Sequence, residues 1–212
     1  MGTILPTNLP VFIVASLVLI LTPGPAVMYI IARSVNHGRK AGLASVLGVE
    51  VGNSVHVIAA TLGLSAILLT SALAFNIVKF VGAAYLIYLG IRTLRTPVTV
   101  DSTDPETPKN LQRVFSQGVI VAILNPKTAL FFLAFLPQFV DMSKGNVSLQ
   151  FFLLGFIFVA MATVSDSLYA ILSGTVGSWL RHNIWFTRFQ RYFAGTIYIG
   201  LGLTAAFANI KD

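Results

Sequence analysis

The chain has 212 residues, of which 56% are hydrophobic and only 10% are charged, and it contains no cysteine. Since a soluble domain of this length carries about 25% charged residues, this composition excludes an ordinary soluble domain, and the lack of cysteine excludes disulfides and thiolate metal sites. The formal net charge of +7 would suggest a nucleic-acid partner for a soluble protein, but the positions of the basic residues favour membrane topology as its cause.

Six apolar stretches are long enough to cross a bilayer, which takes roughly 20 residues. No Lys or Arg precedes the first, unlike the basic segment of a cleaved signal peptide, so we expect it to be retained as a helix. The predicted spans are 9–32, 41–70, 75–94, 115–140, 149–178 and 190–208. We expect a first three-helix repeat at 1–95, a cytoplasmic linker at 96–112 and a second three-helix repeat at 113–212, which together form a single membrane domain.

The basic residues are distributed unequally between the two sides of such a six-span chain. Connections after the odd-numbered spans hold ten: Arg33, Arg39, Lys40, Arg92, Arg95, Lys109, Arg113, Arg181, Arg188 and Arg191. The opposite side holds three, Lys79, Lys144 and Lys211, and the fourteenth, Lys127, falls inside a span. Because cytoplasmic loops are rich in Lys and Arg, we predict a multi-pass protein of the bacterial plasma (inner) membrane with both termini outside the cytoplasm.

The two halves contain similar segments in the same order. Leu21-Thr-Pro-Gly-Pro-Ala26 matches Leu124-Asn-Pro-Lys-Thr-Ala129, and Val51-Gly-Asn-Ser-Val-His56 matches Val164-Ser-Asp-Ser-Leu-Tyr169. Phe80-Val-Gly-Ala-Ala-Tyr85 likewise matches Phe193-Ala-Gly-Thr-Ile-Tyr198. Each half has three spans, an odd number, so the halves enter the membrane from opposite sides. The pattern predicts an all-α fold of two inverted repeats, which is typical of secondary transporters.

Proline-containing breaks interrupt the first and fourth spans. Pro23, Gly24 and Pro25 lie within the first, and Asn125 and Pro126 lie at the matching place in the fourth. Proline removes a backbone donor and clashes with the preceding turn, so both helices should open there and leave backbone groups for a substrate or another helix. The N-terminus of the helix after the break favours an anion such as a carboxylate. The alternative is a kink that serves packing alone.

Lys127 follows the second break directly. A lysine inside the bilayer costs a few kcal/mol even on the most lenient scale, about 2.5 or more, so its ammonium group should face protein or water. It would pair with a carboxylate or bind the acid group of a substrate. Alternatively, the side chain extends to the cytoplasmic interface.

Polar residues lie on one face of each of two predicted helices. Glu50, Asn53 and His56 are spaced i, i+3, i+6 in the second span, and Asp166 and Tyr169 lie at the matching positions of the fifth. An ionisable residue within a membrane is a candidate functional residue, and Asp166 and Glu50 are the candidates for proton coupling. The alternatives are polar contacts between helices and, for His56, a hydrogen bond to a nearby carbonyl.

The sequence contains no nucleophile motif, nucleotide fingerprint or metal motif, so we predict neither an enzyme nor a metal or other cofactor. Glu50, His56 and Asp166 could in principle supply metal ligands, but their spacing is not a recognised metal motif.

These motifs together resemble the LysE/RhtB family of bacterial amino-acid exporters over nearly the whole chain. The residues that carry the resemblance are Thr22-Pro-Gly-Pro25, Ala32-Arg-Ser34, Gly38-Arg-Lys-Ala-Gly42, Gly48-x-x-x-Gly52, Gly82-Ala-Ala-Tyr-Leu-Ile-Tyr-Leu-Gly90 and Asn125-Pro-Lys127. Asn53 departs from the family, in which relatives often carry Asp at that position, and Glu50 lies one turn earlier on the same face. The resemblance implies a plasma-membrane exporter of small amino acids or related metabolites driven by the proton gradient.

We therefore predict secondary active export by proton antiport, with alternating access. The carboxylate of an amino-acid-like substrate would meet Gly24, Pro25 and Lys127, and its ammonium group would meet Asp166 or Glu50. The alternatives are a passive channel for small polar solutes and, less favoured, an intramembrane enzyme. A homodimer is compatible with the small residues Gly82, Ala83 and Ala84, which permit close helix contact.

Overall fold

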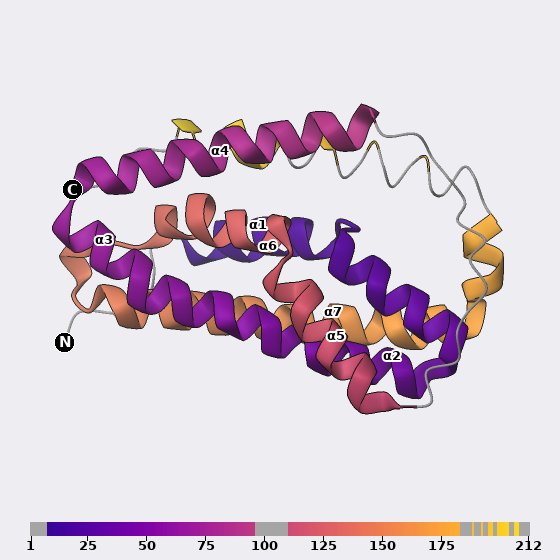
Figure 1. Cartoon of the computed structure of the whole chain (residues 1–212). Helices are drawn as coiled ribbons and strands as arrows, with labels where there is room; N and C mark the ends of the chain where they lie inside the picture. The colour runs from indigo at the N-terminus through magenta and orange to yellow at the C-terminus, as the bar shows by residue number, and fades with distance from the viewer. Residues whose placement is uncertain are drawn as a thin grey trace.

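The computed structural model of the chain describes residues 8–95 and 110–182, and positions 188, 192, 195–196, 199–203 and 206–207. Both termini, most of the predicted linker 96–112 and much of the predicted last span 190–208 lie outside the described residues. Every regular element in the described part is a helix, and no strand occurs there (Figure 1). The all-α prediction therefore holds for this part of the chain.

The helices follow the order of the predicted spans, with breaks at the two predicted places. Segments η1 and η2 are π-helical, and η3 and η4 are short 3₁₀ turns. The elements are α1 (Leu9–Leu21), α2 (Pro25–Ala59), η1 (Ala60–Leu64), α3 (Ser65–Thr70), α4 (Ala72–Arg95), α5 (Leu111–Ile123), α6 (Pro126–Leu130), η2 (Phe131–Phe135), η3 (Leu136–Phe139), η4 (Met142–Lys144) and α7 (Val147–His182).

Two helical stretches are individually long and apolar enough to cross a membrane, Pro25–Ile67 and Val147–Ser173. A third crossing is possible if Leu111–Ile123 and Pro126–Phe139, bent by 41° at their break, form one span. Helix α1 is apolar but shorter. Length and composition thus support two or three crossings in the described residues, consistent with a multi-pass membrane protein.

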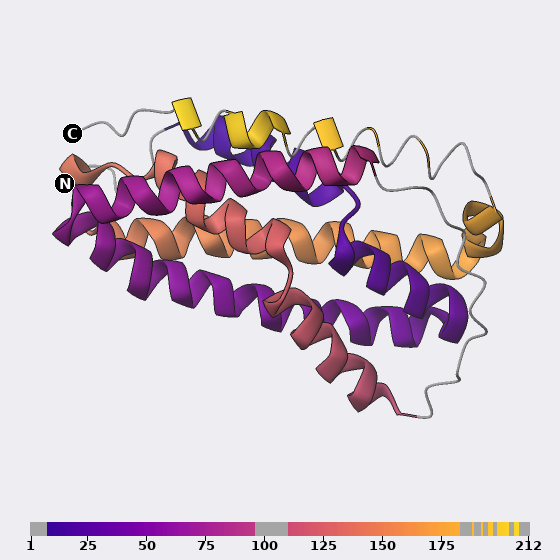
Figure 2. The ribbon, with the colours of Figure 1, turned by 45° about the horizontal axis from the view of Figure 1, so that its top comes forward.

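Helix α2 is not a straight rod. In Figures 1 and 2 its ribbon first runs away from α1 and then doubles back. The backbone of α2 is non-helical at Gly38, which has a φ of 78° and a ψ of 174°. A side chain at that φ would be strained, whereas glycine adopts it freely. Because of this turn, α2 contains both the end of the predicted first span and much of the predicted second span. The turn also explains why the helical stretch Pro25–Ile67 has 43 residues, about twice the length that one crossing needs.

The returning part of α2 packs closely against α5 and α7. A Cβ added at Gly48 would lie 2.2 Å from the Phe115 backbone oxygen, and one added at Gly52 would lie 2.5 Å from the Ala122 Cβ. Small residues spaced in this way let two backbones approach. The Gly48-x-x-x-Gly52 motif therefore forms the crossing of α2 with α5, which carries the second break.

Aromatic side chains fill the core next to the second break. Phe131 lies 5.1 Å from Phe135 and 5.1 Å from Phe158 between ring centroids, and Phe12 of α1 lies 5.3 Å from Phe139. These five rings are buried. Segment η2 thus anchors α6, and Figures 1 and 2 show α6 lying between α4 and α2.

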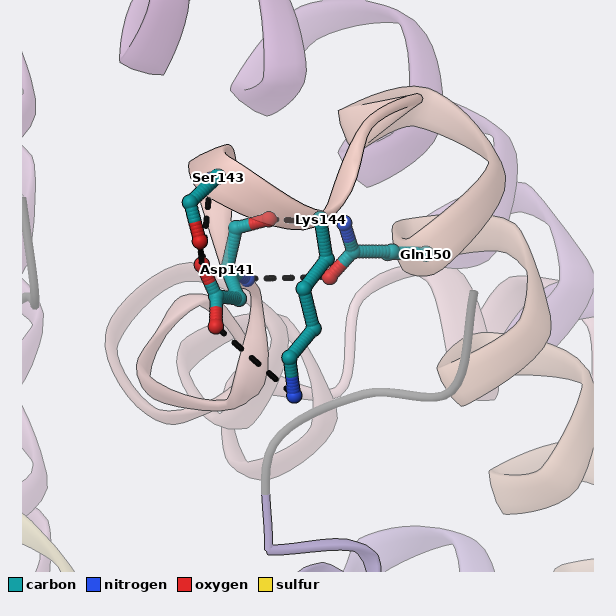
Figure 3. A network of polar contacts seen from close by, with 4 residues as sticks. All are labelled: Asp141, Ser143, Lys144 and Gln150. Carbon is teal, nitrogen blue, oxygen red and sulfur yellow. Dashed lines mark hydrogen bonds and ion pairs between the residues drawn. The ribbon is translucent and has the colours of Figure 1, made fainter. Parts of the chain in front are cut away.

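The connection between η3 and α7 is held by polar side chains (Figure 3). The Gln150 amide pairs with the Asp141 backbone, accepting from its N–H at 2.9 Å and donating to its carbonyl at 2.8 Å. The Asp141 carboxylate accepts from the Ser143 N–H at 3.0 Å and lies 3.8 Å from the Lys144 ammonium group. These contacts tie the connection to the first turn of α7.

The small residues of α4 are used within the chain. Gly82 faces Ala134, since an added Cβ would lie 2.9 Å from the Ala134 Cβ, and Ala83 is buried. Of the three residues on which a dimer contact was predicted, Ala84 is exposed. Gly82 and Ala83 therefore pack within the chain, and the homodimer stays a prediction.

Candidate functional site

The first break separates α1 from α2 at residues 22–24. Pro25 begins α2 and lacks an N–H, and Gly24 before it has an extended backbone with φ −139° and ψ −176°. No side chain caps the N-terminus of α2, although Gly24 and Ala26 are buried. The first N–H groups of a helix lack intrahelical partners, so this end offers donors to an anion.

The second break separates α5 from α6 and is closed by its own residues. Asn125 caps α6, since its side-chain oxygen accepts from the Lys127 backbone N–H at 3.2 Å. Its side-chain nitrogen donates to the Thr128 hydroxyl at 3.1 Å. Asn125 and Thr128 are buried. Of the predicted substrate-binding residues, Asn125 thus acts as a helix cap, and Pro126 is the first residue of α6.

The Lys127 side chain joins the two breaks. It is only 5% exposed, and its Nζ lies 2.5 Å from the carbonyl oxygen of Thr22. Its charge also acts on Asp166, although no ion pair within 4.0 Å involves Lys127 among the described residues. Lys127 therefore faces the protein interior, as one of the two alternatives predicted, and satisfies a carbonyl that the first break leaves free.

Glu50 and Asp166 form a buried carboxyl pair. They are 7% and 4% exposed, and their carboxyl groups are near enough to interact electrostatically. The Asn53 amide donates to Glu50 Oε2 at 3.1 Å. Within the described residues, Glu50 Oε1 and Asn53 Oδ1 have no hydrogen-bond partner. A buried polar atom without a partner is costly. These two oxygen atoms can therefore accept hydrogen bonds from a further donor.

His56 and Tyr169 bind backbone carbonyls. His56 Nε2 lies 3.1 Å from the Ala122 oxygen, and Tyr169 Oη donates to the Leu21 oxygen at 3.0 Å. For His56 this is the predicted alternative to substrate binding. Glu50, His56 and Asp166 do not form a converging set of metal ligands, since no group of three such side chains occurs in the described part of the chain.

Two residues of this region were not predicted as site residues. Thr22 is fully buried and supplies the carbonyl that Lys127 binds, and Ser165, beside Asp166, is buried with a hydroxyl that has no partner among the described residues. A signal for Thr22 existed, because a buried lysine needs an acceptor and a helix break exposes carbonyls. Ser165 gave no signal, since an isolated serine in a membrane helix is common.

Two broken helices that meet at buried ionisable side chains define a multi-pass membrane protein with a polar centre, an arrangement typical of transporters. The chain belongs to the LysE type translocator family, whose sequence profile matches residues 17–209.

Curated relatives span nearly the same length. The chain is 29% identical over 200 residues to an uncharacterized membrane protein of Vibrio cholerae, covering 93% of this chain and 96% of the relative. It is 31% identical over 170 residues to the homoserine/homoserine lactone efflux protein of Salmonella typhimurium, covering 80% and 82%. It is 29% identical over 208 residues to the uncharacterized membrane protein YrhP of Bacillus subtilis, covering 92% and 97%. No solved structure matches the chain.

Proposed function

We propose that this translocator is a secondary active exporter of amino acids or closely related small metabolites. The observation that carries the proposal is Lys127, whose buried ammonium group contacts the first broken helix while its charge acts on Asp166. Opposite charges beside an uncapped helix N-terminus suit a molecule that carries both an ammonium group and a carboxylate. The efflux protein of Salmonella typhimurium, named for homoserine and its lactone, supports an amino-acid-like substrate.

The two breaks support one orientation of the substrate. The α6 N-terminus is occupied by Asn125, whereas no side chain caps the α2 N-terminus. A substrate carboxylate would therefore bind the first turn of α2 near Gly24, where the helix dipole also favours an anion. Its ammonium group would bind the Glu50–Asp166 pair, in which Glu50 Oε1 has no partner among the described residues.

Charge balance supports proton antiport. The buried cluster contains one ammonium group, on Lys127, and two carboxyl groups, on Glu50 and Asp166. Adjacent like charges away from water are unfavourable, so one proton held by the carboxyl pair makes the cluster neutral. An arriving substrate ammonium group would replace this proton, and a returning proton would release the substrate on the other side.

The proposed architecture has six spans in two inverted three-helix repeats, residues 1–95 and 113–212, joined by the linker 96–112. Two observations support it: α1/α2 and α5/α6 break at matching places in the repeat, and the basic residues are unequally distributed between the two sides. The proposed location is the plasma membrane, with both termini outside the cytoplasm.

The test is transport of radiolabelled homoserine by the purified protein in proteoliposomes with an imposed pH gradient. We expect accumulation against the substrate gradient in the parent and loss of accumulation in Asp166→Asn. Downhill flux alone, unaffected by the pH gradient, would favour the channel alternative. Full accumulation by Asp166→Asn would remove Asp166 from proton coupling. In cells loaded with homoserine, expression of the parent should permit growth that an empty control does not.

A further inference from the structure

Each proline at a helix break leaves one carbonyl without its normal donor. In an α-helix the carbonyl of residue i accepts from the N–H of residue i+4, and proline has no N–H. Pro23 and Pro25 therefore remove the helical donors of the Leu19 and Leu21 carbonyls, and Pro126 removes that of Ala122. The sequence alone identifies these three carbonyls, but it does not show which groups bind them.

The donors come from the opposite half of the chain. Tyr169 of α7 donates its hydroxyl to the Leu21 carbonyl, and His56 of α2 bonds the Ala122 carbonyl. Because a carbonyl only accepts, His56 Nε2 must carry the hydrogen. Tyr169 and His56 occupy matching positions of the internal repeat. The two halves are thus tied by a reciprocal pair of bonds.

The reciprocity is not exact in register. In the repeat, Ala122 corresponds to Leu19, two residues before Leu21. The first half contains a second proline, Pro25, which frees a further carbonyl, that of Leu21. Ala122 also accepts from the Asn125 N–H at 3.0 Å, as Leu19 accepts from the Thr22 N–H at 3.1 Å. Tyr169 and His56 therefore each bind a carbonyl that a proline has freed, although the two carbonyls are not at equivalent positions of the repeat.

We infer that Tyr169 and His56 are positioning residues that close the transport site from opposite sides. Each holds the broken-helix end of the other half, and each is released in turn as the site opens. The inference rests on the proposed exporter with inverted repeats, since inversion places the two bonds toward opposite faces of the membrane. One hydrogen bond of this kind changes an equilibrium by about fivefold, which suits a contact that breaks in every cycle.

The test uses the absence of cysteine from the chain. Ser165→Cys places one thiol beside Asp166, at a buried position, and its labelling by a charged, membrane-impermeant thiol reagent is measured from each side in oriented vesicles. Tyr169→Phe removes only a hydroxyl. His56→Phe removes the donor and keeps a ring where His56 stacks on Phe132 at 6.2 Å.

We expect each variant to raise the labelling rate about fivefold from one side, and the two variants to act from opposite sides. His56→Gln, which restores an N–H donor, should return labelling toward the parental rate. Tyr88→Phe, which removes a hydroxyl from an exposed tyrosine of α4, should leave it unchanged.

Three outcomes would overturn the inference: no change in either variant, an increase from the same side in both, or an equal increase from both sides, as general loosening would give. The labelling needs no substrate, so it is independent of the proposed function. The parent could fail to export homoserine while the two variants still raise labelling from opposite sides. That result would contradict homoserine as the substrate and would leave the inference about the two hydrogen bonds unchanged.

Discussion

The Lys127 ammonium group lies 2.5 Å from the carbonyl oxygen of Thr22, so the second broken helix is bonded directly to the first. The residues are 105 positions apart in sequence, and both are buried. A lysine in this place needs acceptors and a compensating charge. Thr22 provides an acceptor, and Asp166 provides the charge. The contact thus links the backbone break to the carboxyl pair.

Replacing Lys127 by Met should lower the free energy of unfolding by about 3 kcal/mol, because it removes a buried charge partner and leaves the Thr22 carbonyl without its donor. Adding Asp166→Asn should recover part of this loss, with a coupling of about 1–3 kcal/mol. Thermal unfolding in detergent measures both. The control, Lys144→Met, affects a partly exposed ion pair and should cost less than about 1 kcal/mol. Strictly additive effects of the two buried substitutions would contradict an electrostatic link.

Gly48→Ala should prevent α2 from packing on α5. Its Cβ would lie 2.2 Å from the Phe115 backbone oxygen, and a backbone atom cannot move aside as the end of a side chain can. We expect a loss of more than about 3 kcal/mol, in the range of severe overpacking, or no folded protein in fluorescence-detected gel filtration. Gly63→Ala is the matched control, since its Cβ meets nothing within 4 Å. Equal yields of the two variants would argue against this crossing.

The helix breaks could be predicted from sequence because their cause is local. Pro23, Pro25 and Pro126 remove donors wherever the chain goes, and α1 and α5 end within a few residues of them. Helical spacing alone also places Glu50 and Asn53 on one face of α2, where the Asn53 amide donates to Glu50. Both are buried, as is Asp166.

The partners of these groups could not be predicted, since they depend on how helices distant in sequence meet. Nothing local indicates that Lys127 reaches Thr22, or that His56 binds Ala122 rather than a substrate. The small residues of α4 illustrate the same limit. Gly82 and Ala83 were correctly identified as residues for close contact, but Gly82 meets Ala134 of the same chain. The turn at Gly38 lies in the predicted connection between the first two spans, but the sequence did not show that the chain stays helical on both sides of this residue.

Gln150→Leu should destabilise the start of α7. Gln150 is fully buried, and its amide makes both a donor and an acceptor bond to the Asp141 backbone. Leucine would take away the acceptor of the buried Asp141 N–H, at about 1–3 kcal/mol, whereas the Asp141 carbonyl still accepts from the Lys144 N–H at 3.2 Å. Ser143→Ala is the control, because it removes an exposed hydroxyl that also contacts Asp141 and should cost less than about 1 kcal/mol. Hydrogen exchange of the amides in 141–150 measures the local effect, and unchanged protection in Gln150→Leu would contradict this account.

Asn125→Ala and Asn110→Ala compare two helix caps of the same residue type in different surroundings. Asn110 caps α5 at the surface, accepting from the Gln112 N–H at 2.8 Å, and its loss should cost about 1 kcal/mol. Asn125 is 2% exposed and also binds Thr128. Its loss should cost about 2–4 kcal/mol, because the Lys127 N–H would remain buried without an acceptor.

Asn125→Asp keeps the acceptor oxygens but cannot donate to Thr128, and it adds a charge near Lys127. Its stability should therefore lie between that of the parent and that of Asn125→Ala. Unfolding midpoints of the three variants in detergent measure the order. If Asn125 supplied a substrate contact rather than a cap, Asn125→Ala would reduce homoserine transport while leaving the unfolding midpoint unchanged.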